Sequence, residues 1–147
     1  MRDHPTAPRP GAAFTLAHLS DAHLTSPGDA RPGELANKRI LGYLSWRWRR
    51  HRVHLPEILE RLTADARARA PDHLVITGDL THLGTPAECL RGLEWLRRCG
   101  DPETVTAIPG NHDRYTRAPW APTVGLWHPY MSGDDGGTGF QIGRAHV

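Results

Sequence analysis

Three short polar clusters in the sequence carry side chains that bind metal ions and move protons. They are Ser20-Asp21-Ala22-His23, Gly78-Asp79 and Gly110-Asn111-His112-Asp113. Asp21 and His23 are two positions apart, so an extended backbone would point one carboxylate and one imidazole toward the same divalent ion. A shell of nitrogen and oxygen without thiolate suits manganese, iron or zinc, and magnesium is a further candidate.

The other side chains of the clusters suit a second ion and a proton donor. Asp79 has two carboxylate oxygens that can bridge two ions, and Asn111 offers a neutral amide oxygen. Two divalent ions about 3.5–4 Å apart clamp the attacking and leaving oxygens of a phosphoryl displacement and lower the pKa of a bound water. His112 is placed to protonate a leaving oxygen, and Asp113 to orient His112.

The elements that must position these clusters are three strands separated by helices. Apolar runs predict strands over 14–19, 73–77 and 103–108, and each strand runs into one of the clusters. Because the connections are long enough for crossovers, this β-α-β-α-β order predicts an α/β fold with a parallel sheet. The carboxyl ends of parallel strands form the ligand-binding edge of such sheets, so we expect the three clusters to meet there.

Helical patterns lie between the strands. They predict helices over 34–52 and 56–70, and a third helix from a Thr85-Pro86-Ala87-Glu88 capping box to Gly100. The expected buried stripes are Leu55, Ile58, Leu59 and Leu62 on the second helix and Leu90, Leu93 and Leu96 on the third. Cys89 and Cys99 stand ten positions apart on the third helix, too far to form a disulfide there. Beyond Tyr115, prolines and glycines predict loop.

Length and composition place the chain among single-domain globular proteins. It has 147 residues, 38% of them hydrophobic, and a net charge of +2. No stretch is apolar enough for a membrane span or a secretory signal, which predicts a cytoplasmic protein. A charge of +2 does not favour a nucleic-acid partner. Residues 1–12 are rich in proline, alanine and arginine and are expected to be a disordered lead.

The three clusters, in their order, resemble the first motifs of the calcineurin-like metallophosphoesterases. The resemblance covers about 14–115 and is closest to the bacterial branch that includes cyclic-nucleotide phosphodiesterases. It implies a four-layer α/β/β/α sandwich, of which this chain is the N-terminal half. It also implies that Asp21 and His23 bind one metal, that Asp79 bridges the two metals and that Asn111 binds the second. His112 would be the catalytic histidine.

The sequence departs from that family after Asp113. The family completes its site with a later single histidine and a Gly-His-x-His motif, whereas only His128 and His146 follow here and no Gly-His-x-His is present. We therefore expect the truncated N-terminal part of a phosphoesterase domain over 13–141, with 142–147 an artefactual tail. His128 is a weak candidate for the missing ligand.

The expected function is a hydrolase that cleaves a phosphomonoester or phosphodiester with two metals and an activated water. The alternative is a catalytically incomplete half-domain that binds metal weakly and has no activity of its own. The expected partner is a phosphorylated small molecule, with nucleotides among the candidates. Weak candidates for substrate contact are His82, Arg47 and Arg49; the last two lie in a Trp-Arg run over 46–52 that is better explained as a solvated helix face whose tryptophans cover the core.

Overall fold

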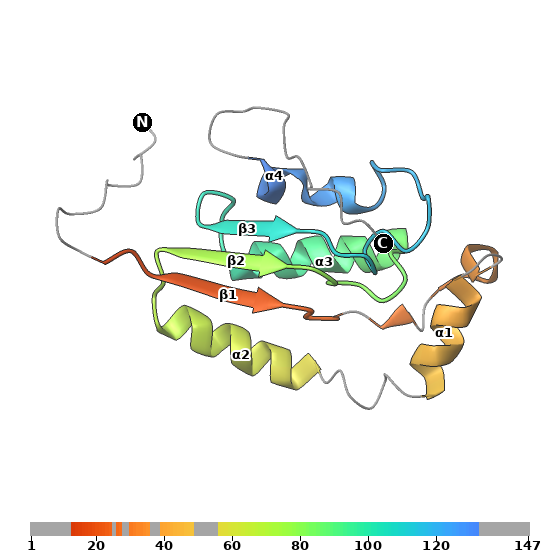
Figure 1. The fold of residues 1–147 in the computed structure, drawn as a ribbon, viewed down its shortest axis with the longest axis horizontal. Coiled ribbons are helices and arrows are strands. Elements are labelled where there is room, and N and C mark those ends of the chain that lie inside the picture. Colours follow the sequence, from red (N-terminus) through yellow and green to blue (C-terminus); the bar gives the residue numbers. More distant parts are fainter. Residues whose placement is uncertain (1–12, 25, 28–29, 36–38, 49–55, 133–147) are drawn as a thin grey trace.

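The chain forms a three-stranded parallel sheet with helices packed around it (Figure 1). A computed structural model describes residues 13–24, 26–27, 30–35, 39–48 and 56–132. The expected disordered lead over 1–12 and the expected tail over 142–147 lie outside the described residues. The elements in chain order are β1 (Leu16–Ser20), a 3-10 helix (Pro32–Leu35), α1 (Arg39–Trp48), α2 (Pro56–Ala68), β2 (His73–Thr77), α3 (Pro86–Cys99), β3 (Val105–Ile108), a 3-10 helix (Val124–Trp127) and α4 (His128–Met131).

The strands lie in the order β1-β2-β3, and both neighbouring pairs are parallel. Leu19 is paired with Ile76, and Ile76 with Ala107. The predicted α/β class and parallel sheet are therefore confirmed. The first predicted helix, over 34–52, begins instead with a 3-10 turn that ends at Leu35, and α1 is described from Arg39 to Trp48. Residues 36–38 and 49–52 of that prediction lie outside the described residues.

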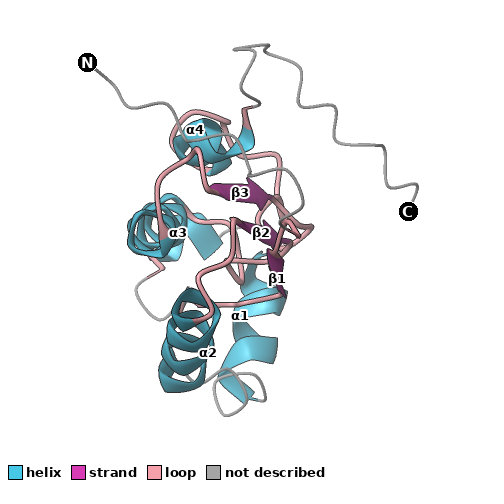
Figure 2. Cartoon of the chain, turned by 90° about the vertical axis from the view of Figure 1, so that its left-hand side faces the viewer, coloured by secondary structure: helices cyan, strands magenta, loops and turns pink. Residues whose placement is uncertain are grey.

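One face of the sheet is covered by α2 and α3 (Figure 2). Alternate residues of β2 and β3 point toward these helices and are buried, as Leu74, Ile76, Val105 and Ala107 show. The predicted capping box is present at the start of α3, where Glu88 is the reciprocal partner of Thr85. This cap fixes the point at which the chain leaves the loop after β2 and enters the helix.

Two expected helix stripes are partly wrong. Ile58, Leu62 and Leu90 are each about half exposed among the described residues, at 50%, 51% and 48%. On α3 the buried stripe is Cys89, Leu93 and Leu96, which follows the i, i+4, i+7 spacing of one helix face. Leu90 lies about 100° around the helix from Cys89 and so falls off that face.

The expected loop after Tyr115 is also wrong in part, because its end folds back onto α3 and β3. Trp127 is fully buried and donates a hydrogen bond from Nε1 to the carbonyl oxygen of Cys89 at 2.8 Å. Tyr130 is buried as well and donates to the carbonyl oxygen of Gly100 at 3.2 Å. Burying such aromatic side chains stabilises a short helix that its proline-rich composition alone does not predict.

No helix in the described part of the chain is long and apolar enough to cross a membrane.

Candidate metal centre

The loops after β1 and β2 stay hydrogen-bonded to each other beyond the ends of the strands. The backbone nitrogen of Asp21 donates to the carbonyl oxygen of Thr77 at 3.2 Å. The backbone nitrogen of His23 donates to the backbone carbonyl oxygen of Asp79 at 2.8 Å. Leu24 continues the pairing with a 3.1 Å bond to the carbonyl oxygen of Leu80. The first two polar clusters are thereby held side by side at the carboxyl edge of the sheet, as the sequence predicts.

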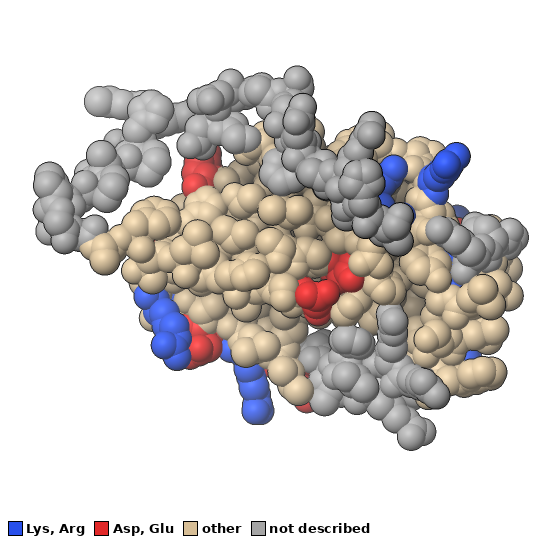
Figure 3. All heavy atoms as spheres, viewed as in Figure 1, with Lys and Arg blue, Asp and Glu red and all other residues tan. Residues whose placement is uncertain are grey.

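Asp21, His23 and Asp79 form a group that can hold a metal ion. One ligand atom of each lies within 4.8 Å of the others; Asp21 is exposed, His23 half-buried and Asp79 buried. In Figure 3 acidic atoms gather just beyond the carboxyl ends of the strands, while the Lys and Arg side chains lie toward the periphery of the view. Two carboxylates and one imidazole without thiolate are a donor set for a divalent cation such as Mn²⁺, Fe²⁺ or Zn²⁺.

The backbone reaches this arrangement through left-handed conformations. The φ angles are 52° at Asp21, 40° at His23 and 34° at Asp79. The expectation of an extended Asp-x-His backbone is therefore wrong, although the two side chains do converge. Each such conformation costs about 1–3 kcal/mol in a residue with a side chain. Backbone strain of this kind concentrates at functional sites, because the surrounding hydrogen bonds hold the chain where the side chains are needed.

Backbone carbonyls orient the imidazoles of His23 and His112. Nδ1 of His23 lies 3.1 Å from the carbonyl oxygen of Thr81, and Nδ1 of His112 lies 2.8 Å from that of His82. Because a carbonyl oxygen only accepts, each Nδ1 carries the hydrogen and donates it. This leaves Nε2 of His23 as the atom that can bind a metal, and it places Nε2 of His112 on the side of the ring away from the His82 carbonyl. The two rings meet edge to face at 5.2 Å.

The turn after β3 approaches Asp79 closely. The backbone nitrogen of His112 donates to Oδ1 of Asp79 at 2.8 Å, and a Cβ on Gly110 would collide with the same carboxylate. Only a glycine therefore lets this turn lie so near the candidate metal ligand. Asn111 lies between Gly110 and His112 in the turn and is exposed. Metal binding by its amide oxygen stays a prediction.

Asp113 ties the loops after β2 and β3 together. Its buried carboxylate accepts hydrogen bonds from the backbone nitrogens of Gly110 and Thr81 at 2.8 Å, from Leu80 at 3.3 Å and from the Thr81 hydroxyl at 2.9 Å. Burial raises the pKa of Asp113 to about 6, and these hydrogen bonds partly oppose the shift. These bonds hold the backbone next to His112; that the carboxylate orients the His112 ring stays a prediction.

The sequence of the chain is similar to those of known proteins. The sequence model of the calcineurin-like phosphoesterase family matches residues 14–143. The chain belongs to this family. Members of this family hydrolyse phosphate esters with the help of metals. A protein of Synechococcus sp. named a probable cyclic nucleotide phosphodiesterase is 43% identical over 49 residues, which span 33% of this chain and 18% of that relative. No solved structure matches the chain.

In this family member, two buried charged groups outside the predicted clusters support the loop that carries Thr81 and His82. Glu88 of α3 is fully buried, and its carboxylate accepts from the backbone nitrogens of His82 at 3.0 Å and Leu83 at 3.2 Å. The Arg39 guanidinium of α1 donates to the carbonyl oxygens of Leu83 and Gly84, both at 2.9 Å. The sequence predicts Glu88 as part of a helix cap, but no sequence pattern predicts that Arg39 contacts this loop.

The weaker candidates from the sequence lie in different parts of this family member. His82 is buried, and its ring stacks on His23 with centroids 4.8 Å apart, so it does reach the site. His128 is exposed at the start of α4 beside Ser132, and it is not part of the described acidic–histidine group. Arg47 is exposed on α1, and Arg49 lies outside the described residues.

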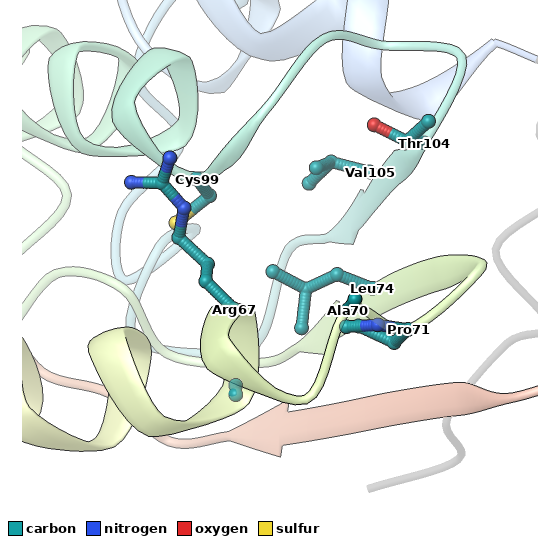
Figure 4. A pocket seen from close by; sticks show the side chains of 8 residues that line it. Arg67, Ala70, Pro71, Leu74, Cys99, Thr104 and Val105 are labelled. Atoms are coloured by element: carbon teal, nitrogen blue, oxygen red, sulfur yellow. The ribbon is translucent and has the colours of Figure 1, made fainter.

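A small hollow of about 150 Å³ lies at the other end of the sheet (Figure 4). It is lined by Leu74 and Val105, at the starts of β2 and β3, together with Arg67 and Cys99. Because these residues precede or begin the strands, the hollow is separate from the candidate metal centre at their carboxyl ends. Burial raises the pKa of Cys99 to about 12, so its thiol stays protonated at neutral pH.

Proposed function

We propose that this chain hydrolyses phosphate esters at a site for two divalent cations at the carboxyl edge of the sheet. Asp21 and His23 would bind the first cation, Asp79 both cations and Asn111 the second. The observation that carries the proposal is that ligand atoms of Asp21, His23 and Asp79 lie within 4.8 Å of one another in a member of a phosphoesterase family.

The bound cations would supply Lewis-acid activation of water and would neutralise the charge of the phosphate. The chain's own contribution is to keep the donor atoms in place before substrate arrives. The Thr81 carbonyl holds the His23 ring in the tautomer with its lone pair on Nε2, and the His112 backbone nitrogen fixes one carboxylate oxygen of Asp79. Such supporting contacts typically change metal affinity 10- to 100-fold when they are removed.

His112 is the proposed proton donor. As the water oxygen bonds to phosphorus, the ester P–O bond breaks and its electron pair goes to the leaving oxygen. That oxygen takes a proton from Nε2 of a doubly protonated His112, whose Nδ1 keeps its own hydrogen on the His82 carbonyl. The attacking water loses one proton to solvent, and a proton from solvent restores the doubly protonated ring. Hydrolysis thus yields an alcohol and a phosphate with one ester bond fewer.

The proposed substrate is a phosphodiester or phosphomonoester of a small molecule. The partial likeness to a protein named a probable cyclic nucleotide phosphodiesterase supports nucleotides as candidates. A net charge of +2 gives no electrostatic reason to prefer a nucleic-acid polymer.

The test is hydrolysis of aryl phosphodiesters by the 147-residue chain with Mn²⁺, with EDTA as the metal-free control. We expect turnover of bis(4-nitrophenyl) phosphate that EDTA abolishes. His112→Gln should lower the rate of diphenyl phosphate hydrolysis by about 10²–10⁴-fold. It should lower the rate of bis(4-nitrophenyl) phosphate hydrolysis much less. The reason is that nitrophenolate is a good leaving group and needs little protonation, whereas phenolate needs a proton. Equal losses on both esters would remove His112 from the role of proton donor.

A second candidate is cation binding without turnover. The observation in its favour is that the sequence has no Gly-His-x-His motif and that His128 stands outside the described metal-binding group. Mn²⁺ binding by calorimetry, together with no release of nitrophenol above the EDTA control, would favour this candidate. Metal-dependent turnover would exclude it.

A further inference from the structure

A pocket lies directly beside His112, between α1 and the loops after β2 and β3. Its volume is about 250 Å³, and its lining includes Trp46 and Ser45 of α1, His82, His112 and Tyr115. The pocket thus adjoins the side chain that is proposed to protonate the leaving oxygen. The organic group bonded to that leaving oxygen can therefore occupy the pocket.

The α1 wall of the pocket is firmly attached to the rest of the site. Arg39 is buried at the first turn of α1 and donates to the carbonyl oxygens of Leu83 and Gly84. One turn later Gly42 lies against Leu83 and Tyr115 so closely that a Cβ would stand 2.6 Å from the Leu83 side chain and 3.2 Å from the Tyr115 hydroxyl oxygen. These contacts set the separation between Trp46 and the loop residues of the pocket.

Among the described residues, the lining is mainly aromatic, with the rings of Trp46, His82, His112 and Tyr115, and it includes no Asp, Glu, Lys or Arg. The Tyr115 ring stacks on His112 with centroids 5.8 Å apart and an angle of 22° between the planes. The Trp46 ring lies 6.4 Å from that of His82, tilted by 55°. Such walls favour a flat, uncharged ring over a charged or strongly hydrated group, because aromatic faces stack on other π-systems.

We propose that this pocket binds a planar aromatic ring carried by the leaving oxygen of the substrate, with Trp46 and Tyr115 as the side chains that select it. The proposal rests on the proposed function, since it assumes that the phosphate lies at the candidate metal centre. The volume is just below the range of about 300–1,000 Å³ typical of drug-sized ligands. It therefore suits one ring system rather than a lipid or an oligosaccharide.

The experiment measures the binding of three phosphonates to the Mn²⁺-loaded chain by calorimetry. In benzylphosphonate, cyclohexylmethylphosphonate and ethylphosphonate a CH₂ group replaces the leaving oxygen, so that nothing is hydrolysed. All three present the same phosphonate to the metal centre, and they differ in what enters the pocket. We expect benzylphosphonate to bind at least fivefold more tightly than either of the other two.

The variants test Trp46 itself. Trp46→Ala should remove the preference for benzylphosphonate and leave the affinity for ethylphosphonate within twofold, while Trp46→Phe should retain most of the preference. Trp48→Ala is the matched control, because Trp48 lies on the same helix, is 74% exposed and does not line the pocket. It should change neither affinity.

Three results would overturn the aromatic pocket: equal affinity for benzylphosphonate and ethylphosphonate, equal affinity for the benzyl and cyclohexylmethyl compounds, or an unchanged preference in Trp46→Ala. A wild-type chain that binds Mn²⁺ but none of the phosphonates would instead contradict the proposed function, and the pocket proposal would fall with it. The two failures are distinguishable. If ethylphosphonate binds and benzylphosphonate binds no more tightly, the result supports the metal centre and contradicts the proposed aromatic pocket.

Discussion

Oδ1 of Asp79 accepts a hydrogen bond from the backbone nitrogen of His112 at 2.8 Å. This contact links the candidate bridging ligand after β2 to the candidate proton donor after β3, although 33 positions separate them in the sequence. A shift in one loop therefore moves both groups.

Asp79→Asn should weaken Mn²⁺ binding more than tenfold and leave the free energy of unfolding of the metal-free chain nearly unchanged. The amide oxygen can still accept from the His112 nitrogen, but the negative charge that attracts the cation is gone. Calorimetric titration with Mn²⁺ and urea unfolding measure the two effects. Asp72→Asn is the control, since its exposed carboxylate accepts from the Thr15 nitrogen before β2 begins. If both variants bind Mn²⁺ equally well, Asp79 is not a ligand.

Gly110→Ala should disrupt the site through a steric collision. The added Cβ would meet the Asp79 carboxylate, the Asp79 backbone nitrogen and Cα of Gly78, and two of these three are backbone atoms that cannot move aside cheaply. We expect a lower midpoint of urea unfolding and weaker Mn²⁺ binding. Gly33→Ala provides the comparison, because a Cβ at Gly33 has nothing within 4 Å. Equal midpoints and affinities for the two variants would show that the turn tolerates a side chain.

Asp113→Asn should destabilise the fold by about 1–3 kcal/mol, because the amide group presents hydrogens to backbone nitrogens that themselves need acceptors. Urea unfolding of the metal-free chain measures this loss directly. Asp65→Asn is the matched change on the surface, where Asp65 pairs with Arg69 at 3.1 Å and both side chains are largely exposed. That variant should change stability by less than about 0.5 kcal/mol. Losses of similar size would mean that the Asp113 hydrogen bonds contribute little.

The cysteines should be inert in the folded chain and reactive in the unfolded one. Burial raises the pKa of Cys89 and of Cys99 from 9.0 to about 12, so the thiolate fraction at pH 8 is on the order of 10⁻⁴. Ellman's reagent at pH 8 should modify both thiols only after urea is added. Because the unfolded thiols ionise near pH 9 and the folded ones do not, the free energy of unfolding should fall as the pH rises from 9 toward 12. Rapid modification without urea would contradict the buried position of these side chains.

Local sequence patterns were sufficient for the elements that carry the site. The β2 strand is found where its apolar run predicts it, and the Thr85–Glu88 capping box begins α3 as expected. Both signals act over a few neighbouring residues, so they depend little on contacts with distant segments. The predicted stripe on α3 failed at Leu90, since the face that a helix buries depends on its rotation against the sheet. That rotation is decided by distant partners such as Trp127, whose indole hydrogen-bonds to the Cys89 carbonyl.

For this protein, the sequence by itself determined the types of chemical groups and the edge of the sheet at which they gather. The reason is that the succession of strands and helices along the chain and the polar residues after each strand are local properties, and helical crossovers make successive strands parallel. Only the tertiary structure decided how those groups are aimed. The left-handed backbone at Asp21 and His23, the Thr81 and His82 carbonyls that orient two imidazoles, and the α1 wall over His112 all depend on contacts between segments far apart in the chain. Main-chain carbonyls are present at every position, so no residue type reveals in advance which of them will hold a ring.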